Sequence, residues 1–116
     1  SLDKTARLWS LPAGKLLRTF RIPIGASKDG EIYAVALSPD GRLVATDSQY
    51  KYGKNGDVEC FIYVFDTVSG EIRNRIGPLP DLVRDLAFSP DGRFLAAGLF
   101  RQNGIRLWTK EANGSF

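Results

Sequence analysis

The sequence contains no histidine and a single cysteine, Cys60. Without an imidazole there can be no Ser-His-Asp or Cys-His arrangement and no histidine-ligated metal. One cysteine cannot form an internal disulfide or a cysteine-rich zinc site. Without a basic partner, Cys60 is expected to behave as a small hydrophobic residue. These absences exclude the common catalytic arrangements, and we predict a protein that is not an enzyme and that uses no metal or cofactor.

Long apolar runs and a strong charge imbalance are also missing. The 116 residues include 16 Lys and Arg against 13 Asp and Glu, and the resulting net charge of +3 is too small to favour nucleic acid by itself. No apolar stretch approaches the ~20 residues of a membrane span, and no signal-peptide pattern opens the chain, so we expect a cytoplasmic protein. Methionine is absent as well, and we expect the chain to be an excerpt of a longer protein.

An internal repeat is the strongest signal in the sequence. Residues 35–45 return as residues 86–96, and both copies contain Ser-Pro-Asp-Gly-Arg. An alternating run that ends in an aromatic residue recurs three times, at Trp9, Phe65 and Trp108. The first interval between these aromatic residues is 56 residues and the second is 43. The second interval falls in the range of ~40–45 residues that is typical of a four-stranded propeller blade.

The repeated segments have the composition of strands and turns. They are rich in Val, Ile, Leu, Phe and Tyr and are bounded by clusters of Gly, Pro, Asp and Ser. In Ser-Pro-Asp-Gly, the φ of proline suits a type I turn and the glycine supplies a positive φ, so each copy should close a hairpin. No segment of ten or more residues shows a helical period. The sequence therefore predicts an all-β fold.

The motif and its period resemble the WD-repeat family. Residues 1–9, which end in Ala-Arg-Leu-Trp, look like the end of one WD repeat, and the two Ser-Pro-Asp-Gly-Arg hairpins look like the inner strands of the next two. The resemblance covers about residues 1–108 and implies consecutive four-stranded antiparallel blades of a WD-repeat β-propeller. The sequence is most similar in character to WD-repeat regions of large bacterial multidomain proteins, some of which have a caspase-like peptidase domain.

The resemblance also implies structural roles for particular residues. Trp9, Phe65 and Trp108 take the place of the aromatic residue that ends the third strand of a blade, where they would form inter-blade core rather than a ligand cage. Family blades often join Asp, His, Ser or Thr, and Trp in a buried hydrogen-bond network. Here Asp3 and Trp9 keep the spacing, with Thr5 between them, but the Gly-His dipeptide of the family is missing. We therefore expect the blades to rely more on apolar packing than on this network.

The strand pattern divides the chain into four parts. Residues 1–22 correspond to the last two strands of one blade, 23–77 to a full blade, 78–108 to the first three strands of the next blade, and 109–116 to a C-terminal tail. A closed propeller needs about four to eight blades, so these are too few to close a ring alone. Because unpaired strand edges are templates for pairing, we predict possible self-association through the terminal edges, each of which has a tryptophan, Trp9 or Trp108.

Two connections are longer than their counterparts in the neighbouring repeat, at residues 23–31 and 49–57. In an up-and-down blade, the connection after the second strand and the one that leads to the next blade share one face. Because binding residues concentrate in long loops on a rigid scaffold, we predict that this face contacts a partner through the following residues: Lys28, Asp29, Glu31, Tyr50, Lys51, Tyr52, Lys54 and Asn55. The alternative is a solvated insertion whose tyrosines pack on their own blade.

Two functions follow as hypotheses. The first is a non-enzymatic scaffold for protein–protein interaction, which binds other proteins or other domains of the parent chain. The second is a regulatory or sensor segment of a larger signalling or caspase-like peptidase protein, whose catalytic domain lies outside these residues. We expect neither a membrane nor nucleic acid as a partner. Weak nucleic-acid binding through the Tyr-Lys segment would depend steeply on salt.

Overall fold

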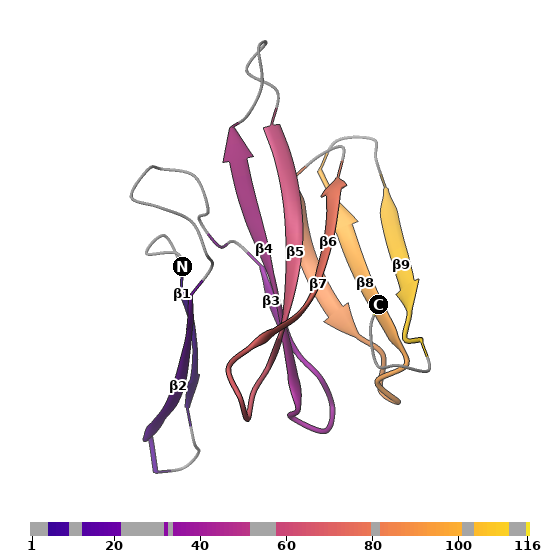
Figure 1. Ribbon diagram of the computed structural model, residues 1–116. Coiled ribbons are helices and arrows are strands. Elements are labelled where there is room, and N and C mark those ends of the chain that lie inside the picture. The colour runs from indigo at the N-terminus through magenta and orange to yellow at the C-terminus, as the bar shows by residue number, and fades with distance from the viewer. Residues whose placement is uncertain are drawn as a thin grey trace.

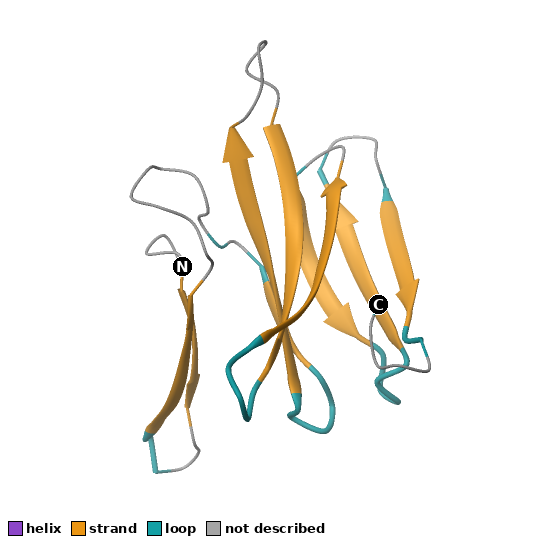
Figure 2. Cartoon of the chain, viewed as in Figure 1, coloured by secondary structure: helices purple, strands orange, loops and turns teal. Residues whose placement is uncertain are grey.

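Nine strands form three antiparallel sheets among the described residues of the computed structural model (Figures 1 and 2). The structure describes residues 5–9, 13–21, 32, 34–51, 58–79, 82–100, 104–111 and 116, and there is no helix among them. The first sheet contains β1 (Thr5–Trp9) and β2 (Leu16–Arg21). The second contains β3 (Val35–Leu37), β4 (Leu43–Lys51), β5 (Val58–Asp66) and β6 (Ile72–Leu79). The third contains β7 (Val83–Phe88), β8 (Phe94–Leu99) and β9 (Ile105–Thr109). The prediction of an all-β fold is confirmed, and the boundaries expected between repeats stay predictions.

The two Ser-Pro-Asp-Gly turns have the same conformation. The backbone N–H of Gly41 donates a hydrogen bond to the carbonyl oxygen of Ser38 at 2.9 Å, and Gly41 has a φ of 72°. The Ser38 hydroxyl donates to the Asp40 carboxylate at 2.7 Å. The second turn repeats these contacts with Ser89, Asp91 and Gly92. Each turn therefore closes its hairpin with its own side chains and needs glycine at the last position, where φ is positive.

The three sheets lie side by side and pack face to face (Figure 1). Between the first and second sheets, the core contains Phe20, Ile32, Val44, Phe61, Tyr63 and Phe65. Between the second and third sheets, it includes Leu43, Ala45, Ile62, Val64, Val83, Leu86, Leu95, Ala97 and Leu99. Successive side chains of a strand point to opposite faces, so β5 contributes Ile62 and Val64 to one core and Phe61, Tyr63 and Phe65 to the other.

The β4–β5 hairpin is the longest in the described part of the chain. Both strands have nine residues, whereas β8 has six and β9 has five. Tyr50 pairs with Glu59, and Lys51 pairs with Val58. The prediction that the connection begins at residue 49 is therefore wrong for Gln49, Tyr50 and Lys51, which lie in β4. The strands continue because their backbone N–H and C=O groups pair with one another as far as Lys51 and Val58. Tyrosine is also a residue type that is favoured in strands.

The three recurring aromatic residues occupy equivalent positions in the three sheets. A register shift separates Leu8 from Trp9 where β1 pairs with β2, and another precedes Phe65 where β5 pairs with β6. Trp108 pairs with Leu95 on β8, just as Phe65 pairs with the corresponding residue of β4. Each aromatic residue should therefore face the sheet that precedes its own.

Burial agrees with this arrangement. Phe65 is 2% exposed and its ring lies 5.4 Å from the ring of Phe20 in the first sheet. Trp108 is half-buried and packs against the core between the second and third sheets. Trp9 is 51% exposed, because the described residues include no sheet before its own. Trp108 lies on β9, an edge strand of the third sheet, and its side chain packs inward against the core.

Candidate functional site

Most of the residues predicted to bind a partner lie outside the part of the chain that the structure describes. These are Lys28, Asp29, Glu31, Tyr52, Lys54 and Asn55. Asp3, which was expected to take part in the buried hydrogen-bond network, also lies outside the described residues. The backbones of Tyr50 and Lys51 are placed at the end of β4. The structure thus defines the strands from which the predicted binding residues extend. Tyr50 and Lys51 are the last two residues of one of these strands, β4.

The two ends of the sheets differ in their connections (Figure 2). We call the end where β4 stops at Lys51 and β5 begins at Val58 the hairpin end. At the opposite end, the turn end, the short turns of the chain gather at residues 38–42, 66–71 and 89–93. The last pair of β4 and β5, Lys51 with Val58, and the short turns are therefore at opposite ends of the described sheets.

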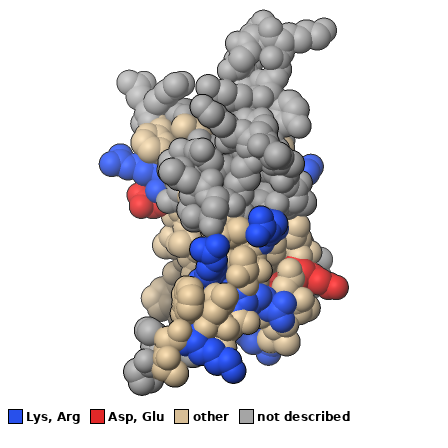
Figure 3. Space-filling view, turned by 90° about the vertical axis from the view of Figure 1, so that its left-hand side faces the viewer, with Lys and Arg blue, Asp and Glu red and all other residues tan. Residues whose placement is uncertain are grey.

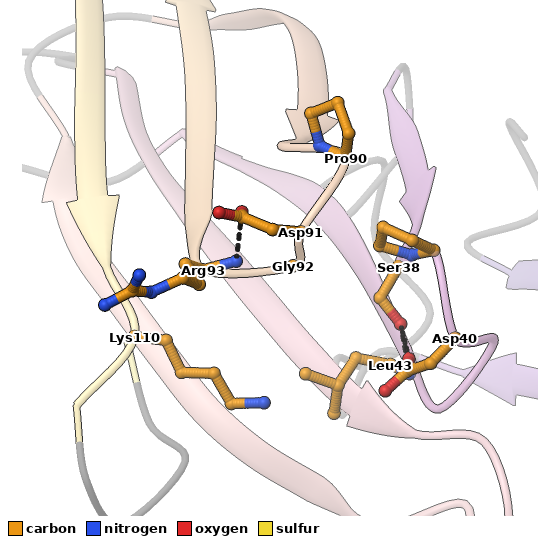
Figure 4. A pocket seen from close by; sticks show the side chains of 9 residues that line it. Ser38, Asp40, Leu43, Pro90, Asp91, Gly92, Arg93 and Lys110 are labelled. Atoms are coloured by element: carbon orange, nitrogen blue, oxygen red, sulfur yellow. Dashed lines mark hydrogen bonds between the residues drawn. The ribbon is translucent and has the colours of Figure 1, made fainter.

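A cavity of about 440 Å³ lies at the turn end, between the two Ser-Pro-Asp-Gly-Arg turns (Figure 4). It is lined by Ser38, Pro39, Asp40, Leu43, Pro90, Asp91, Gly92, Arg93 and Lys110. A neighbouring hollow of about 230 Å³ shares Asp40, Leu43 and Lys110 with it and adds Arg42, Asp66 and Arg73. These two cavities together form a groove, which was not predicted from the sequence. Its signal was the repeated turn, because equivalent turns of two stacked sheets must lie next to each other.

The carboxylates in the groove are held ionised by the turns that contain them. A hydrogen bond from the Ser38 hydroxyl, and then one from the backbone N–H of Arg42, lower the pKa of Asp40 below its ordinary value. The equivalent donors of the second turn lower the pKa of Asp91. Lys110 lies near enough to Asp40 to add to the lowering. These carboxylates therefore stabilise their own turns first and are available to a ligand only through their remaining oxygen.

Asp66 closes the turn between β5 and β6 in a different way. Its Oδ1 accepts hydrogen bonds from the backbone N–H groups of Ser69 and Val68, at 3.0 and 2.8 Å, and these lower the pKa of its carboxyl group. Its Oδ2 lies 3.4 Å from the guanidinium of Arg73. This ion pair is partly exposed, so its contribution to stability is small. Asp66 is a turn residue rather than a reactive one.

The groove contains charged side chains, but its described residues form neither a metal site nor a catalytic pair. Within the described ranges, no group of three or more His, Cys, Asp or Glu residues could hold a metal ion. The side chains of Arg42, Arg93 and Lys110 donate no hydrogen bond to another described residue. The groove can therefore accept polar groups of a partner segment, and its geometry does not combine a nucleophile with a base.

The described residues also form no helix that is long and apolar enough to cross a membrane.

Comparison with known proteins identifies the family to which this fold belongs. A family model described as "WD domain, G-beta repeat" matches residues 14–66 and 73–109. The chain is 31% identical over 110 residues to a guanine nucleotide-binding protein subunit beta of Arabidopsis thaliana, an alignment that covers 91% of this chain and 26% of the plant protein. It is 26% identical over 129 residues to WD repeat-containing protein SL1-17 of Schistosoma mansoni, covering 84% of this chain and 41% of that protein. The chain thus spans less than half the length of these curated relatives. Because the family model matches most of its residues, the chain belongs to the WD-repeat family, and its antiparallel sheets are blades of the β-propeller type.

Proposed function

We propose that this chain is a non-catalytic scaffold for protein–protein interaction and that it presents its hairpin end to a protein partner. Membership of the WD-repeat family supports a role in binding other proteins. The likeness to a protein named as a subunit of a larger assembly supports it further. The observation that argues for the hairpin end is the length of β4 and β5, which extend past the strands of the neighbouring sheet (Figure 1).

The projecting hairpin has a firmly buried base. Cys60 and Ile62 are fully buried, and so are Asp47 and Ser48 on the opposing strand. The carboxylate of Asp47 also accepts a hydrogen bond from the backbone N–H of Ala34 at 2.8 Å. Because the base cannot shift without disturbing the core, the backbones of β4 and β5 are held in their register at the base of the hairpin. A backbone that is already ordered loses little conformational entropy when a partner binds.

The composition of the hairpin suits protein contacts. Tyr50, Lys51, Tyr52 and Lys54 alternate aromatic and basic side chains within five positions. Tyrosine is enriched in protein interfaces because it buries a large area and offers a hydroxyl. The two lysines favour a partner surface that contains carboxylates at the rim.

The test is a variant in which residues 50–59 are replaced by Asn-Gly. Gln49 and Cys60 are register partners, so a two-residue turn can join them without changing the strands below. The matched control is the double variant Arg93→Ala/Lys110→Ala, which alters the turn end and leaves the hairpin intact. Proteins captured by the three chains are quantified by mass spectrometry, and a captured protein is then purified and titrated directly.

The proposal expects the shortened hairpin to lose at least about tenfold in affinity for that protein, while the control binds like the natural chain. Circular dichroism should give the same β content for all three chains. Equal binding by the shortened chain, or loss of binding in the Arg93/Lys110 variant alone, would contradict the assignment of the hairpin end.

The other predictions about the parent protein stay predictions. These are a regulatory or sensor role within a larger signalling or caspase-like peptidase protein, a bacterial multidomain context and a cytoplasmic location. The coding sequence on both sides of this segment tests the first two directly. A flanking catalytic domain would favour the regulatory role, and further blades alone would favour the scaffold.

A further inference from the structure

We propose that the groove at the turn end is a second binding site, which takes an extended acidic segment of a partner protein. The segment places carboxylates beside Arg42, Arg93 and Lys110 and an apolar side chain between the two Ser-Pro-Asp-Gly-Arg turns. This site is separate from the hairpin end, which lies at the opposite end of the described sheets. The two sites are independent of each other, so either can fail a test alone.

Both walls of the groove are complete hairpin turns. One turn joins β3 to β4 and the other joins β7 to β8, so equivalent residues of two neighbouring sheets line the groove from both sides. A Cβ atom added to Gly92 would lie 3.8 Å from Cδ of Pro39, so the two turns come within van der Waals reach at this point. The larger hollow of the groove, about 440 Å³, falls in the range of ~300–1,000 Å³ that is typical of ligand sites.

Three cations line the groove and form no ion pair with a described residue. The side chains of Arg42, Arg93 and Lys110 are all exposed. In the described part of the chain, the ion pair of this region joins Arg73 to Asp66 and includes none of the three. Figure 4 shows the ammonium group of Lys110 pointing from the end of β9 into the space between the turns. Exposed cations of this kind favour a ligand that supplies carboxylates.

The carboxylates of the groove are already used by their own turns. Oδ1 of Asp40 accepts hydrogen bonds from the Ser38 hydroxyl at 2.7 Å and from the backbone N–H of Arg42 at 3.0 Å. Oδ1 of Asp91 accepts the equivalent two bonds in the second turn. The negative charge of both groups nevertheless remains in the groove. A ligand with separate carboxylates can avoid these positions, whereas a nucleic acid has a phosphate at every nucleotide and is disfavoured.

The groove also has an apolar part. Leu43 lines both of its hollows, and Pro39 and Pro90 lie one on each turn. Burial of a proline costs no side-chain entropy, so these rings offer apolar surface to a ligand at little cost. An apolar side chain can pack here while carboxylates on both sides of it reach the cations. The combination favours a protein segment over a small free anion.

The backbone of the cationic residues is already fixed by hydrogen bonds. The N–H of Lys110 donates to the carbonyl oxygen of Arg93 at 2.7 Å, and the N–H of Thr67 donates to that of Arg42 at 3.0 Å. The Thr67 hydroxyl also donates to the carbonyl oxygen of Gly41 at 2.7 Å. Each turn is thus held by the residue that follows the third strand of its sheet. A backbone that is ordered in this way loses little entropy when a ligand binds.

The test begins with a library of random 12-residue peptides displayed on phage and selected on the natural chain. Selected peptides should be enriched in Asp and Glu on both sides of an apolar residue. One of these peptides is then synthesised with a fluorescent label and titrated by fluorescence anisotropy. A matched peptide with Asn for each Asp and Gln for each Glu should bind at least about tenfold more weakly.

Variants of the chain then locate the bound peptide. Arg93→Ala/Lys110→Ala removes two of the three cations and should weaken binding of the peptide at least about tenfold. Arg93→Lys/Lys110→Arg keeps both charges and should bind within about threefold of the natural chain. The chain with residues 50–59 replaced by Asn-Gly should bind the peptide like the natural chain, because the hairpin end is not part of this site.

A second cationic surface supplies the matched control. Figure 3 views the side of the first sheet and shows Lys and Arg side chains gathered there. Arg7 of β1 and Arg21 of β2 are exposed and line neither hollow of the groove. Arg7→Ala/Arg21→Ala removes the same charge as the groove variant and should leave the affinity for the peptide unchanged. Circular dichroism should give the same β content for all variants.

Several outcomes would overturn the proposal. Selected peptides without enrichment in acidic residues would do so, and so would equal binding by Arg93→Ala/Lys110→Ala and the natural chain. Weaker binding by the Arg7/Arg21 variant or by the shortened hairpin, with the groove variant unaffected, would place the peptide elsewhere. A 12-nucleotide single-stranded DNA that binds as tightly as the peptide, and that the groove variant weakens equally, would contradict the choice of a protein segment.

Discussion

The guanidinium of Arg18 donates a hydrogen bond to the carbonyl oxygen of Val68, 50 positions away in the chain, at a distance of 2.6 Å. This contact joins β2 of the first sheet to the turn between β5 and β6 of the second. Asn74, at the equivalent position of β6, accepts a hydrogen bond from the backbone N–H of Phe116 at 2.6 Å. The same position of the outermost strand thus contacts a segment outside its own sheet in both cases, in addition to the apolar cores.

Removal of the Arg18 contact should loosen the first sheet without unfolding the rest. Arg18→Met keeps most of the apolar stem and loses the donors, and we expect a cost of about 1 kcal/mol because the hydrogen bond is charged but exposed. Hydrogen exchange should become faster in β1 and β2 and stay unchanged in β7–β9. Arg21→Met, on the opposite face of β2, is the control. Equal exchange rates in both variants would show that the contact does not hold the sheets together.

Truncation of the three equivalent aromatic residues should give three different losses of stability. Phe65→Ala should cost about 3–5 kcal/mol because the ring is buried between two sheets. Trp108→Ala should cost about 2 kcal/mol, since its side chain is half-buried. Trp9→Ala should cost less than about 1 kcal/mol because its ring is half exposed. Urea unfolding at low protein concentration measures the order, and a Trp9 variant as unstable as the Phe65 variant would contradict the sheet arrangement.

Periodicity alone predicted the strands, but it could not predict how deeply each equivalent residue is buried. Trp9, Phe65 and Trp108 end similar runs in the sequence, and what separates them is whether a preceding sheet covers them. The length of the β4–β5 hairpin was missed for a related reason. Tyr50 and Lys51 are polar enough to resemble loop residues. They belong to β4 because they pair with Glu59 and Val58 of β5, and this pairing is not visible in the sequence. Both properties depend on contacts between segments that are distant in the sequence.

The groove at the turn end was missed for the same physical reason. Each Ser-Pro-Asp-Gly-Arg motif was correctly predicted to be a hairpin turn, with glycine at a positive φ. The cavity between the two turns exists because stacking of the sheets brings Pro39 near Pro90 and places Lys110 beside both. A local motif determines the turn, and the packing of two sheets determines the cavity.

Acid should destabilise the chain through its turn carboxylates. The pKa values of Asp40, Asp66 and Asp91 are lowered in the folded protein, so the folded state binds protons less readily than the unfolded state. This contribution to stability is fully present above the unfolded pKa and is lost as the pH falls through the folded values. Urea midpoints should therefore be constant from neutral pH to about pH 5 and decrease below about pH 4.

The double variant Asp40→Asn/Asp91→Asn is the control for this acid dependence. It should be less stable than the natural chain near neutral pH and should lose less stability on acidification, because two of the three carboxyl groups with a lowered pKa are gone. An acid dependence as steep as that of the natural chain would mean that other carboxylates are responsible.

Gly77 should be the least replaceable glycine of the described turns and strands. Its φ is 136°, and an added Cβ would lie 2.9 Å from the carbonyl oxygen of Cys60 and 2.9 Å from Cδ1 of Phe61. Gly77→Ala should therefore cost about 2–4 kcal/mol. Gly41 has a φ of 72° and open space around the added atom, so Gly41→Ala should cost about 1 kcal/mol. Thermal unfolding of the two variants compares these costs, and an equal loss would contradict the close packing of β6 on β5.

The proposed binding face is tested most directly by hydroxyl-radical footprinting of the chain, alone and in complex with a purified partner. Side chains covered by the partner become less reactive, and the modified residues are read by mass spectrometry. If the hairpin end binds, Tyr50 and Tyr52 should lose most of their reactivity in the complex, while Pro39, Pro90 and Lys110 at the turn end keep theirs. Protection of the turn-end residues with unchanged reactivity of both tyrosines would contradict the account.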